Sequence, residues 1–86
     1  MNVLIPSNLA DYAGHEHRVT ASGATLAEAL ADLDRRYPGI RFRIVSEQDR
    51  IRRHVKIFVN REQAKRLDAP LAARDEIMIV CALSGG

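Results

Sequence analysis

The stretch TLAEALADLDRRYPG, residues 25–39, predicts a long helix around which the rest of the chain is organised. Thr25 followed three residues later by Glu28 is a capping box, in which both side chains accept hydrogen bonds from otherwise unpaired backbone N–H groups. Apolar side chains recur at helical spacing and form one stripe, made of Leu26, Leu30, Leu33 and Tyr37. Pro38, followed by glycine, ends the pattern. We therefore expect a helix over residues 26–37 with a single apolar face.

Four short runs around this helix are typical of strands, because they alternate apolar and polar residues or are apolar throughout. They cover residues 2–6, 17–21, 54–60 and 76–83. The first two predict a hairpin with a long loop, and the last is apolar on both faces, as in a central strand. Three further stretches are interpreted as connections: residues 7–14, 61–75, and 40–53, whose first apolar residues alternate in a way that also suits a strand. The order ββαββ indicates an α+β fold.

The two faces of the predicted sheet differ, because one helix covers only one face of a small sheet. The inner face is predicted to hold Val3, Ile5, Val55, Ile57, Val59, Ile77, Ile79 and Cys81. The outer face then carries Leu4, Phe58, Met78, Val80 and Ala82. These residues are either a docking surface or scattered, partly covered surface residues, which are common.

Length and composition describe one small domain. With 86 residues, 47% of them hydrophobic, the chain can bury a compact core. The formal net charge of +2 is too small to indicate nucleic-acid binding. The basic cluster RIRRH at residues 50–54 is interpreted as a solvated loop, with a partner contact as the alternative. No signal peptide or membrane span is visible, so we expect a cytoplasmic protein without a membrane partner.

Residues that often catalyse reactions or bind metals do not combine into a site. His15 and His17 point to one side of a strand, but no further ligand is near them in sequence, so no metal site is predicted. Cys81, the single cysteine, excludes an internal disulfide, and its phase with Ile77 and Ile79 predicts a buried thiol. The chain has no glycine-rich phosphate loop. We expect a substrate of enzymes rather than an enzyme, without a cofactor of its own.

The sequence closes with Leu83, Ser84, Gly85 and Gly86, directly after the last predicted strand. We expect residues 1–82 to form the domain and residues 83–86 a flexible tail, which spans about 13 to 14 Å when extended. Glycines lack a Cβ, so such a tail can enter a narrow channel. An α-carboxylate has a pKa of roughly 3.5 and is a poor electrophile at neutral pH, so it needs activation, for example as a mixed anhydride with AMP.

The chain resembles the ThiS/MoaD family of ubiquitin-like sulfur carriers, most of all the branch that includes the mycobacterial carrier for cysteine synthesis. The matching segments are ATLAEALADLDRRYPGI (24–40), RRHVKIFVN (52–60), LAARDEIMIV (71–80) and LSGG (83–86). The resemblance implies a β-grasp fold with the first and last strands parallel and adjacent. The chain departs from the family pattern at Arg74, where a glycine is common, and at Arg61-Glu62, where a glycine or aspartate pair is usual in the turn.

The resemblance also implies a function. An E1-like enzyme, both adenylyltransferase and sulfurtransferase, would use ATP to adenylate Gly86, and sulfur would then replace the adenylate to give a thiocarboxylate. Gly85 would be the required neighbour. A downstream biosynthetic enzyme would accept the sulfur for cysteine or another thio-metabolite, thiamine or molybdopterin. The residues expected to dock the activating enzyme are those of the outer face, namely Leu4, Phe58, Met78 and Val80.

Two other functions stay open on the sequence alone. The first is a ubiquitin-like modifier that is joined to target lysines through Gly86, with the same chemistry up to the adenylate. The second is an interaction module whose tail is inert, in which case deleting Gly86 would change nothing.

Overall fold

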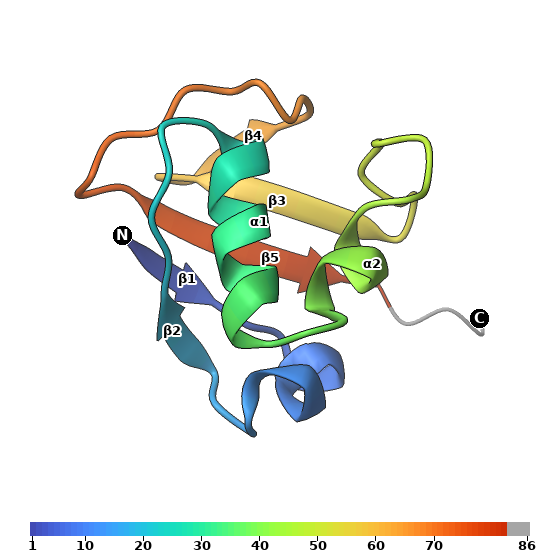
Figure 1. Cartoon of the computed structure of the whole chain (residues 1–86). Helices are drawn as coiled ribbons and strands as arrows, with labels where there is room; N and C mark the ends of the chain where they lie inside the picture. Colours follow the sequence, from blue (N-terminus) through green and yellow to red (C-terminus); the bar gives the residue numbers. More distant parts are fainter. Residues whose placement is uncertain (83–86) are drawn as a thin grey trace.

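The computed structural model describes residues 1–82, which form a mixed sheet with helices on one side (Figure 1). The elements in chain order are β1 (Asn2–Leu4), η1 (Ser7–Ala13), β2 (Arg18–Thr20), α1 (Leu26–Arg36), α2 (Ile40–Ile44), β3 (Val55–Val59), β4 (Glu62–Ala64) and β5 (Glu76–Cys81). The strand order is β2-β1-β5-β3-β4. β1 runs parallel to β5, and the other pairs are antiparallel. The expected β-grasp arrangement is therefore confirmed, with the last strand at the centre of the sheet.

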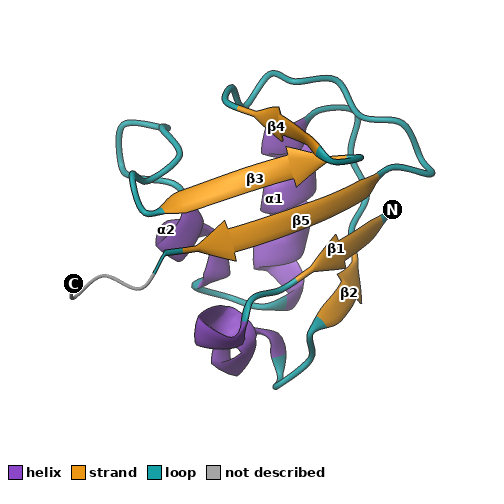
Figure 2. Ribbon diagram, turned by 180° about the vertical axis from the view of Figure 1, so that it is seen from behind, coloured by secondary structure: helices purple, strands orange, loops and turns teal. Residues whose placement is uncertain are grey.

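The helix α1 crosses the inner face of the sheet and supplies much of the core (Figure 2). The predicted cap is present: the Glu28 N–H donates to Thr25 Oγ1 over 3.3 Å, and Glu28 Oε1 accepts from the Ala24 N–H over 3.1 Å. The helix ends at Arg36, one residue before the predicted end. Its apolar stripe packs against the inner-face strand residues, and the largest fully buried side chains include Leu26, Leu30, Leu33, Ile57, Ile77 and Ile79.

The short helix α2 occupies a stretch where the sequence suggested an irregular connection or a strand. Ile40 and Ile44 lie four residues apart and both are fully buried, which is the spacing of a helix face. Asp34 Oδ1 accepts hydrogen bonds from the N–H groups of Gly39 and Arg41, each over 3.1 Å. These bonds satisfy donors that the start of a helix leaves unpaired, so this carboxylate fixes where α2 begins.

The strand β4 also lies in a stretch that was interpreted as a connection. It follows β3 through a two-residue turn at Asn60 and Arg61, because Val59 pairs with Glu62. The turn is thus formed by Asn60 and Arg61, one residue earlier than the turn at Arg61-Glu62 expected from the sequence. Both turn residues have positive φ, 50° for Asn60 and 75° for Arg61, as a type I′ hairpin turn requires. Asparagine tolerates this backbone conformation well, whereas arginine is strained in it.

The connection between β1 and β2 is long, as predicted, but it contains the 3-10 helix η1. This helix buries Leu9, Ala10 and Ala13. The hairpin that it closes has antiparallel register, from Asn2 opposite Thr20 to Leu4 opposite Arg18, so both strands are shorter than their predicted runs. The loop therefore contributes its own apolar side chains to the interior.

A carboxylate on α1 joins the otherwise apolar inner layer. Asp32 is 7% exposed and accepts hydrogen bonds from the Ser22 N–H over 3.0 Å and from Arg35 Nη2 over 2.6 Å. Arg36 Nη2 lies 3.4 Å from Asp32 Oδ2, the oxygen that accepts from the Ser22 N–H. The Ser22 hydrogen bond above all, followed by the two arginines, holds the pKa of Asp32 below its ordinary value. The ionised side chain ties the segment that enters α1 to the helix itself.

The predicted division of the sheet into two faces is confirmed, with two residues less buried than expected. The deeply buried inner-face residues are at most 4% exposed: Val3, Ile5, Val55, Ile57, Ile77 and Ile79. Val59 and Cys81 are only partly buried, because each lies at the end of its strand. In residues 1–82 all the helices lie on the inner side, so the outer face, seen in front in Figure 2, is uncovered.

Candidate functional site

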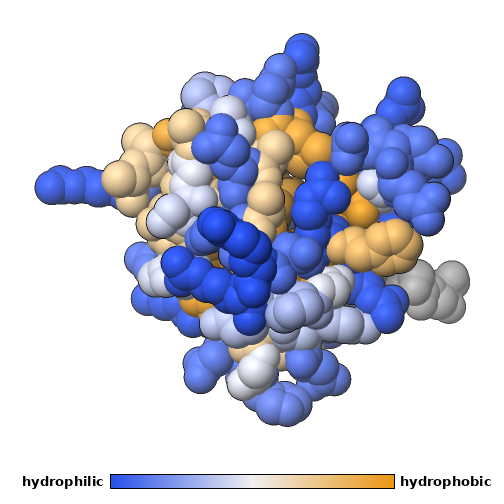
Figure 3. Space-filling view, in the orientation of Figure 1, coloured by the Kyte–Doolittle hydropathy of each residue, from blue (hydrophilic) through white to orange (hydrophobic). Residues whose placement is uncertain are grey.

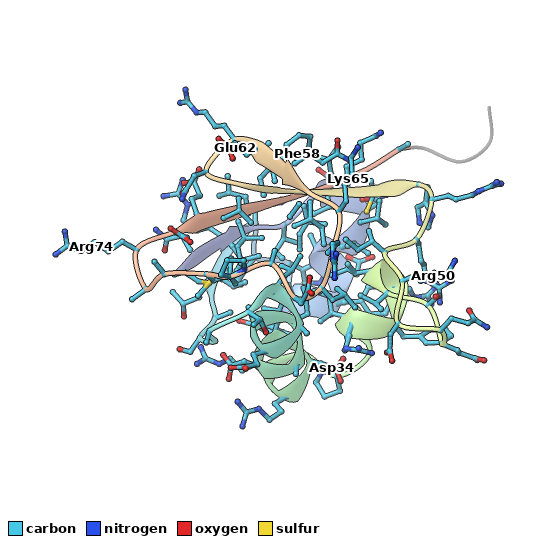
Figure 4. All side chains as sticks on the ribbon, turned by 90° about the horizontal axis from the view of Figure 1, so that it is seen from above. Asp34, Arg50, Phe58, Glu62, Lys65 and Arg74 are labelled. Carbon is cyan, nitrogen blue, oxygen red and sulfur yellow. The ribbon has the colours of Figure 1, made fainter. Side chains whose placement is uncertain are left out.

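Three apolar side chains form a row across the centre of the outer face. The register places Leu4 of β1 opposite Met78 of β5, and Met78 opposite Phe58 of β3. Met78 is 37% exposed, and Leu4 and Phe58 are half-buried. Figure 4 shows Phe58 on the side of the sheet away from α1. Side chains directly opposite one another lie about 5 Å apart, so these residues form one continuous surface and are not scattered.

Val80 extends this row along β5 toward the end of the strand. It is 38% exposed and lies opposite Lys56 of β3. The structure thus brings together the apolar residues that the sequence analysis selected for docking, and they are called the outer-face patch below: Leu4, Phe58, Met78 and Val80.

The strand β5 leads from this patch to the end of the described chain. The Ala82 N–H donates to the His54 carbonyl over 2.7 Å, so pairing with the segment before β3 continues past Cys81. The remaining predicted site residues follow directly in sequence but lie outside the described residues: Leu83, Ser84, Gly85 and Gly86. The outer-face patch is consequently next to the point from which residue 83 continues.

The basic segment 50–54 lies at the same end of the molecule, beside α2 and the end of β5 (Figure 1). Arg52 is held there by two contacts. Its Nε donates to the Phe42 carbonyl over 2.7 Å, and its guanidinium carbon lies 4.7 Å from the centre of the Phe42 ring. Phe42 itself is 53% exposed. The segment is therefore partly ordered by α2, which the solvated-loop interpretation did not include.

The opposite end of β5 is fixed by a hydrogen-bond network. Asn60 donates through Nδ2 to Asp75 Oδ1 over 2.8 Å, and Asn60 Oδ1 accepts from the Glu76 N–H over 3.0 Å. Asp75 Oδ2 accepts from the Ala72 N–H over 2.8 Å. The Ala72 bond, and then the Asn60 bond, lower the pKa of Asp75 from its ordinary value. This network sets the start of β5 and therefore the register that aligns the outer-face patch.

The other candidate residues do not form a reactive centre. Cys81 packs partly buried against the core, and burial raises the pKa of its thiol, which favours the unreactive protonated form. His15 Nδ1 lies 3.2 Å from the Asp11 carboxylate on the surface. In residues 1–82 no three histidine, cysteine or acidic side chains are placed to hold a metal ion. Cys81 is therefore less buried than predicted, although its structural role agrees with the prediction.

Lys56 and the Arg52–Phe42 pair are not among the site residues predicted from the sequence. The strand alternation places Lys56 on the outer face with Phe58, so this residue was within reach of the sequence pattern. The Arg52–Phe42 contact depends on α2. This helix was not predicted, because its residues alternate between apolar and polar as in a strand.

A five-stranded sheet in this order, one long helix across its inner face and an uncovered apolar outer face define a ubiquitin-like β-grasp domain. A family model described as the ThiS family matches residues 3–86. The chain belongs to this family, which confirms the resemblance expected from its sequence.

Individual relatives agree with this assignment. The chain is 34% identical over 91 residues to the sulfur carrier protein CysO of Mycobacterium tuberculosis, and the match covers 100% of this chain and 98% of CysO. A chain of the BexX/CysO complex of Amycolatopsis orientalis superimposes with a TM-score of 0.91 at 34% identity, covering 99% of this chain and 98% of that chain. The small archaeal modifier protein 1 (SAMP1) of Haloferax volcanii gives a TM-score of 0.80 at 30% identity, and the match covers 100% of this chain and 98% of that chain.

No helix in residues 1–82 combines the length and the apolar character needed to cross a bilayer.

Proposed function

We propose that this chain is a sulfur carrier that holds sulfur as a thiocarboxylate on Gly86. The carrier role is that of its CysO relatives and of the ThiS family, whose members are small carriers and not catalysts. Two observations support Gly86 as the reacting residue. The family match runs through residue 86, and the uncovered outer-face patch lies immediately before residues 83–86.

The chemistry proceeds in two steps. A carboxylate oxygen of Gly86 attacks the α-phosphorus of ATP in an activating adenylyltransferase, and pyrophosphate leaves. Hydrosulfide then attacks the carbonyl carbon of the acyl adenylate, and AMP leaves with the electron pair of the broken C–O bond. A thiocarboxylate results. Because Gly85 and Gly86 lack a Cβ, nothing crowds the carbonyl carbon during these attacks.

The outer-face patch docks the activating enzyme and so places Gly86 in the enzyme's active site. Burying Phe58, Met78 and Val80 against a partner removes apolar surface from water, which favours binding. Residues 83–86 span about 13 to 14 Å when extended, which is enough to enter a neighbouring active site. A downstream biosynthetic enzyme then accepts the sulfur, for cysteine or another thio-metabolite, thiamine or molybdopterin.

Intact-mass spectrometry tests the carrier chemistry directly. The chain is incubated with the activating enzyme from its own genome, ATP and sulfide. We expect a mass increase of one oxygen-to-sulfur exchange, localised to the peptide that contains Gly86. A variant extended by one alanine after Gly86 is the matched control. It keeps the same core but moves the carboxylate away from the AMP-forming position, and displacements of about 1 Å can cost roughly a hundredfold in rate. An unchanged parent mass, or equally fast activation of the untrimmed extended variant, rejects the proposal.

A protein-modifier role is the second candidate, and the similarity to SAMP1 is the observation that favours it. Both candidates share the adenylation step, so the product distinguishes them. Lysine-linked conjugates of the Gly86 carboxyl group in a lysate of the source cells would support a modifier. Free thiocarboxylate without such conjugates would support a carrier alone.

A further inference from the structure

A basic surface borders the outer-face patch. β4 pairs only with residues 57–59 of β3 and ends at Ala64. A cavity of about 210 Å³ lies beside this end of β4. The positively charged side chains in its lining are Arg52, Arg53, Lys56 and Lys65, and this cavity is called the basic notch below. The rest of its lining is neutral and includes the buried Val55 and Ile57. The notch is thus a positively charged recess beside buried apolar residues of β3.

The charges of the notch are not neutralised within the described chain. Among residues 1–82, no carboxylate forms an ion pair with Arg53, Lys56 or Lys65. The neighbouring Arg66, by contrast, is paired with Asp68 over 2.8 Å. An anionic group that enters the notch is therefore attracted by several positive charges at once.

Arg52 is held in its orientation by contacts within the chain. Its Nε is bonded to the Phe42 carbonyl and its guanidinium is stacked on the Phe42 ring. Within residues 1–82 its Nη groups donate no hydrogen bond, so these donors remain for a ligand. A guanidinium that is already oriented loses little freedom when it binds a carboxylate through two parallel N–H···O bonds.

Size and position select the kind of ligand. Pockets for small organic ligands usually measure about 300 to 1,000 Å³, so a cavity of 210 Å³ suits a single side chain better than a free metabolite. Lys56 lies opposite Val80, so the notch adjoins the outer-face patch. An apolar centre with a polar rim is the usual composition of a protein–protein interface.

We propose that the basic notch receives the carboxylate of a glutamate or aspartate side chain from the activating enzyme that docks on the outer-face patch. This inference rests on the proposed function. The apolar patch supplies contact area, and the notch adds a charged contact that strengthens docking.

Steady-state kinetics of ATP–pyrophosphate exchange test the inference. The double variant Arg53→Glu/Lys65→Glu is compared with the parent and with Arg74→Glu, which changes an exposed arginine at the opposite end of the molecule from Arg50 (Figure 4). We expect the KM for the double variant to rise roughly tenfold or more, with kcat unchanged. Parent and double variant should converge as salt is added, because salt screens the charges. The KM of Arg74→Glu should stay within about twofold of that of the parent.

Three results would overturn the inference. An unchanged KM in a folded double variant shows that the notch does not contact the enzyme. A fall in kcat alone shows that these charges act on the chemistry and not on docking. Saturable binding of inorganic phosphate to the parent at constant ionic strength, followed by NMR, together with an unchanged KM, assigns the notch to a free anion. A parent chain that is not adenylated at all rejects the proposed function as well, whereas the first three results leave that function intact.

Discussion

The two faces of the sheet carry similar apolar side chains with opposite surroundings. Ile79 of β5 is 2% exposed beneath the helices, and its neighbour Val80 is 38% exposed on the outer face. The surface seen from the helix side is largely hydrophilic (Figure 3), although it covers the buried apolar cluster. The inner residues are thus explained by packing within the chain. The outer residues are not, and their apolar character is consistent with the docking surface proposed above.

The largest expected effect is a difference in the free energy of unfolding between substitutions on the inner and on the outer face. Ile79→Ala leaves a cavity in the core and should lower the free energy of unfolding by about 2 to 5 kcal/mol. Val80→Ala, one residue further along the same strand, should change it by less than about 1 kcal/mol, because its side chain is already in contact with water. Urea denaturation of both variants measures the difference. Equal losses would show that the outer face is also structural.

The second prediction is that substitutions on the outer face weaken binding to the activating enzyme more than they lower stability. Val80→Asp and Phe58→Asp should each weaken binding to the activating enzyme by about 2 kcal/mol or more, as expected for an anchor at the centre of an interface. Their melting temperatures should fall less than that of Ile79→Ala. Isothermal titration calorimetry and thermal melting provide the two values. Unfolded variants would mean that the face is needed for folding, and folded variants with parental affinity would place the interface elsewhere.

A third prediction concerns the turn at the edge of both faces. Arg61 has a φ of 75°, so Arg61→Gly should relieve backbone strain and raise the free energy of unfolding by about 1 kcal/mol. Arg74→Gly is the matched control. Arg74 is not among the residues with positive φ, so glycine there should not stabilise the chain. Chemical denaturation checks both, and a destabilised Arg61→Gly would refute the turn assignment.

The smallest effect is expected from Asp32, the charged side chain buried in the inner layer of residues 1–82. The folded-state pKa of Asp32 is lowered, so its ionised form contributes stability that is complete above the unfolded value of 3.8 and is lost as the pH falls through the folded value. The parent should therefore be more stable than Asp32→Asn at neutral pH. The difference should shrink as the pH falls below 3.8. Urea midpoints measured between neutral pH and roughly pH 2 follow this change, and a difference that does not vary with pH would contradict it.

Most of the fold could be predicted because its main elements carry strong local patterns. Thr25 and Glu28 define the start of α1, and alternation defines the central strands β3 and β5. β4 could not be predicted, since its Glu-Gln-Ala sequence has no alternation and depends on the Asn60 turn. α2 could not be predicted either. Its five residues alternate like a strand, and only the burial of Ile40 and Ile44 against α1 and η1 selects a helix.

The candidate site divides in the same way. The outer-face patch follows from alternation along single strands, which is local information. The basic notch combines residues from the segment before β3, from β3 itself and from the end of β4. Its assembly depends on where β4 stops pairing and on the Phe42 contact that orders Arg52, and neither is encoded in any one stretch of sequence.

The central position of β5 has a consequence for how the chain is made. β5 is the only strand that joins the β2–β1 hairpin to the β3–β4 hairpin in the described sheet, and it is the last of the five to be synthesised. Its pairing with β1 closes a loop of more than seventy residues, from Leu4 to Met78, which is a long-range contact of the kind that slows folding. Without residues 76–81 the sheet lacks the strand between β1 and β3, and the outer-face patch lacks Met78 and Val80. On the proposed function, the activating enzyme would therefore meet a complete docking surface only on chains whose translation has already passed β5.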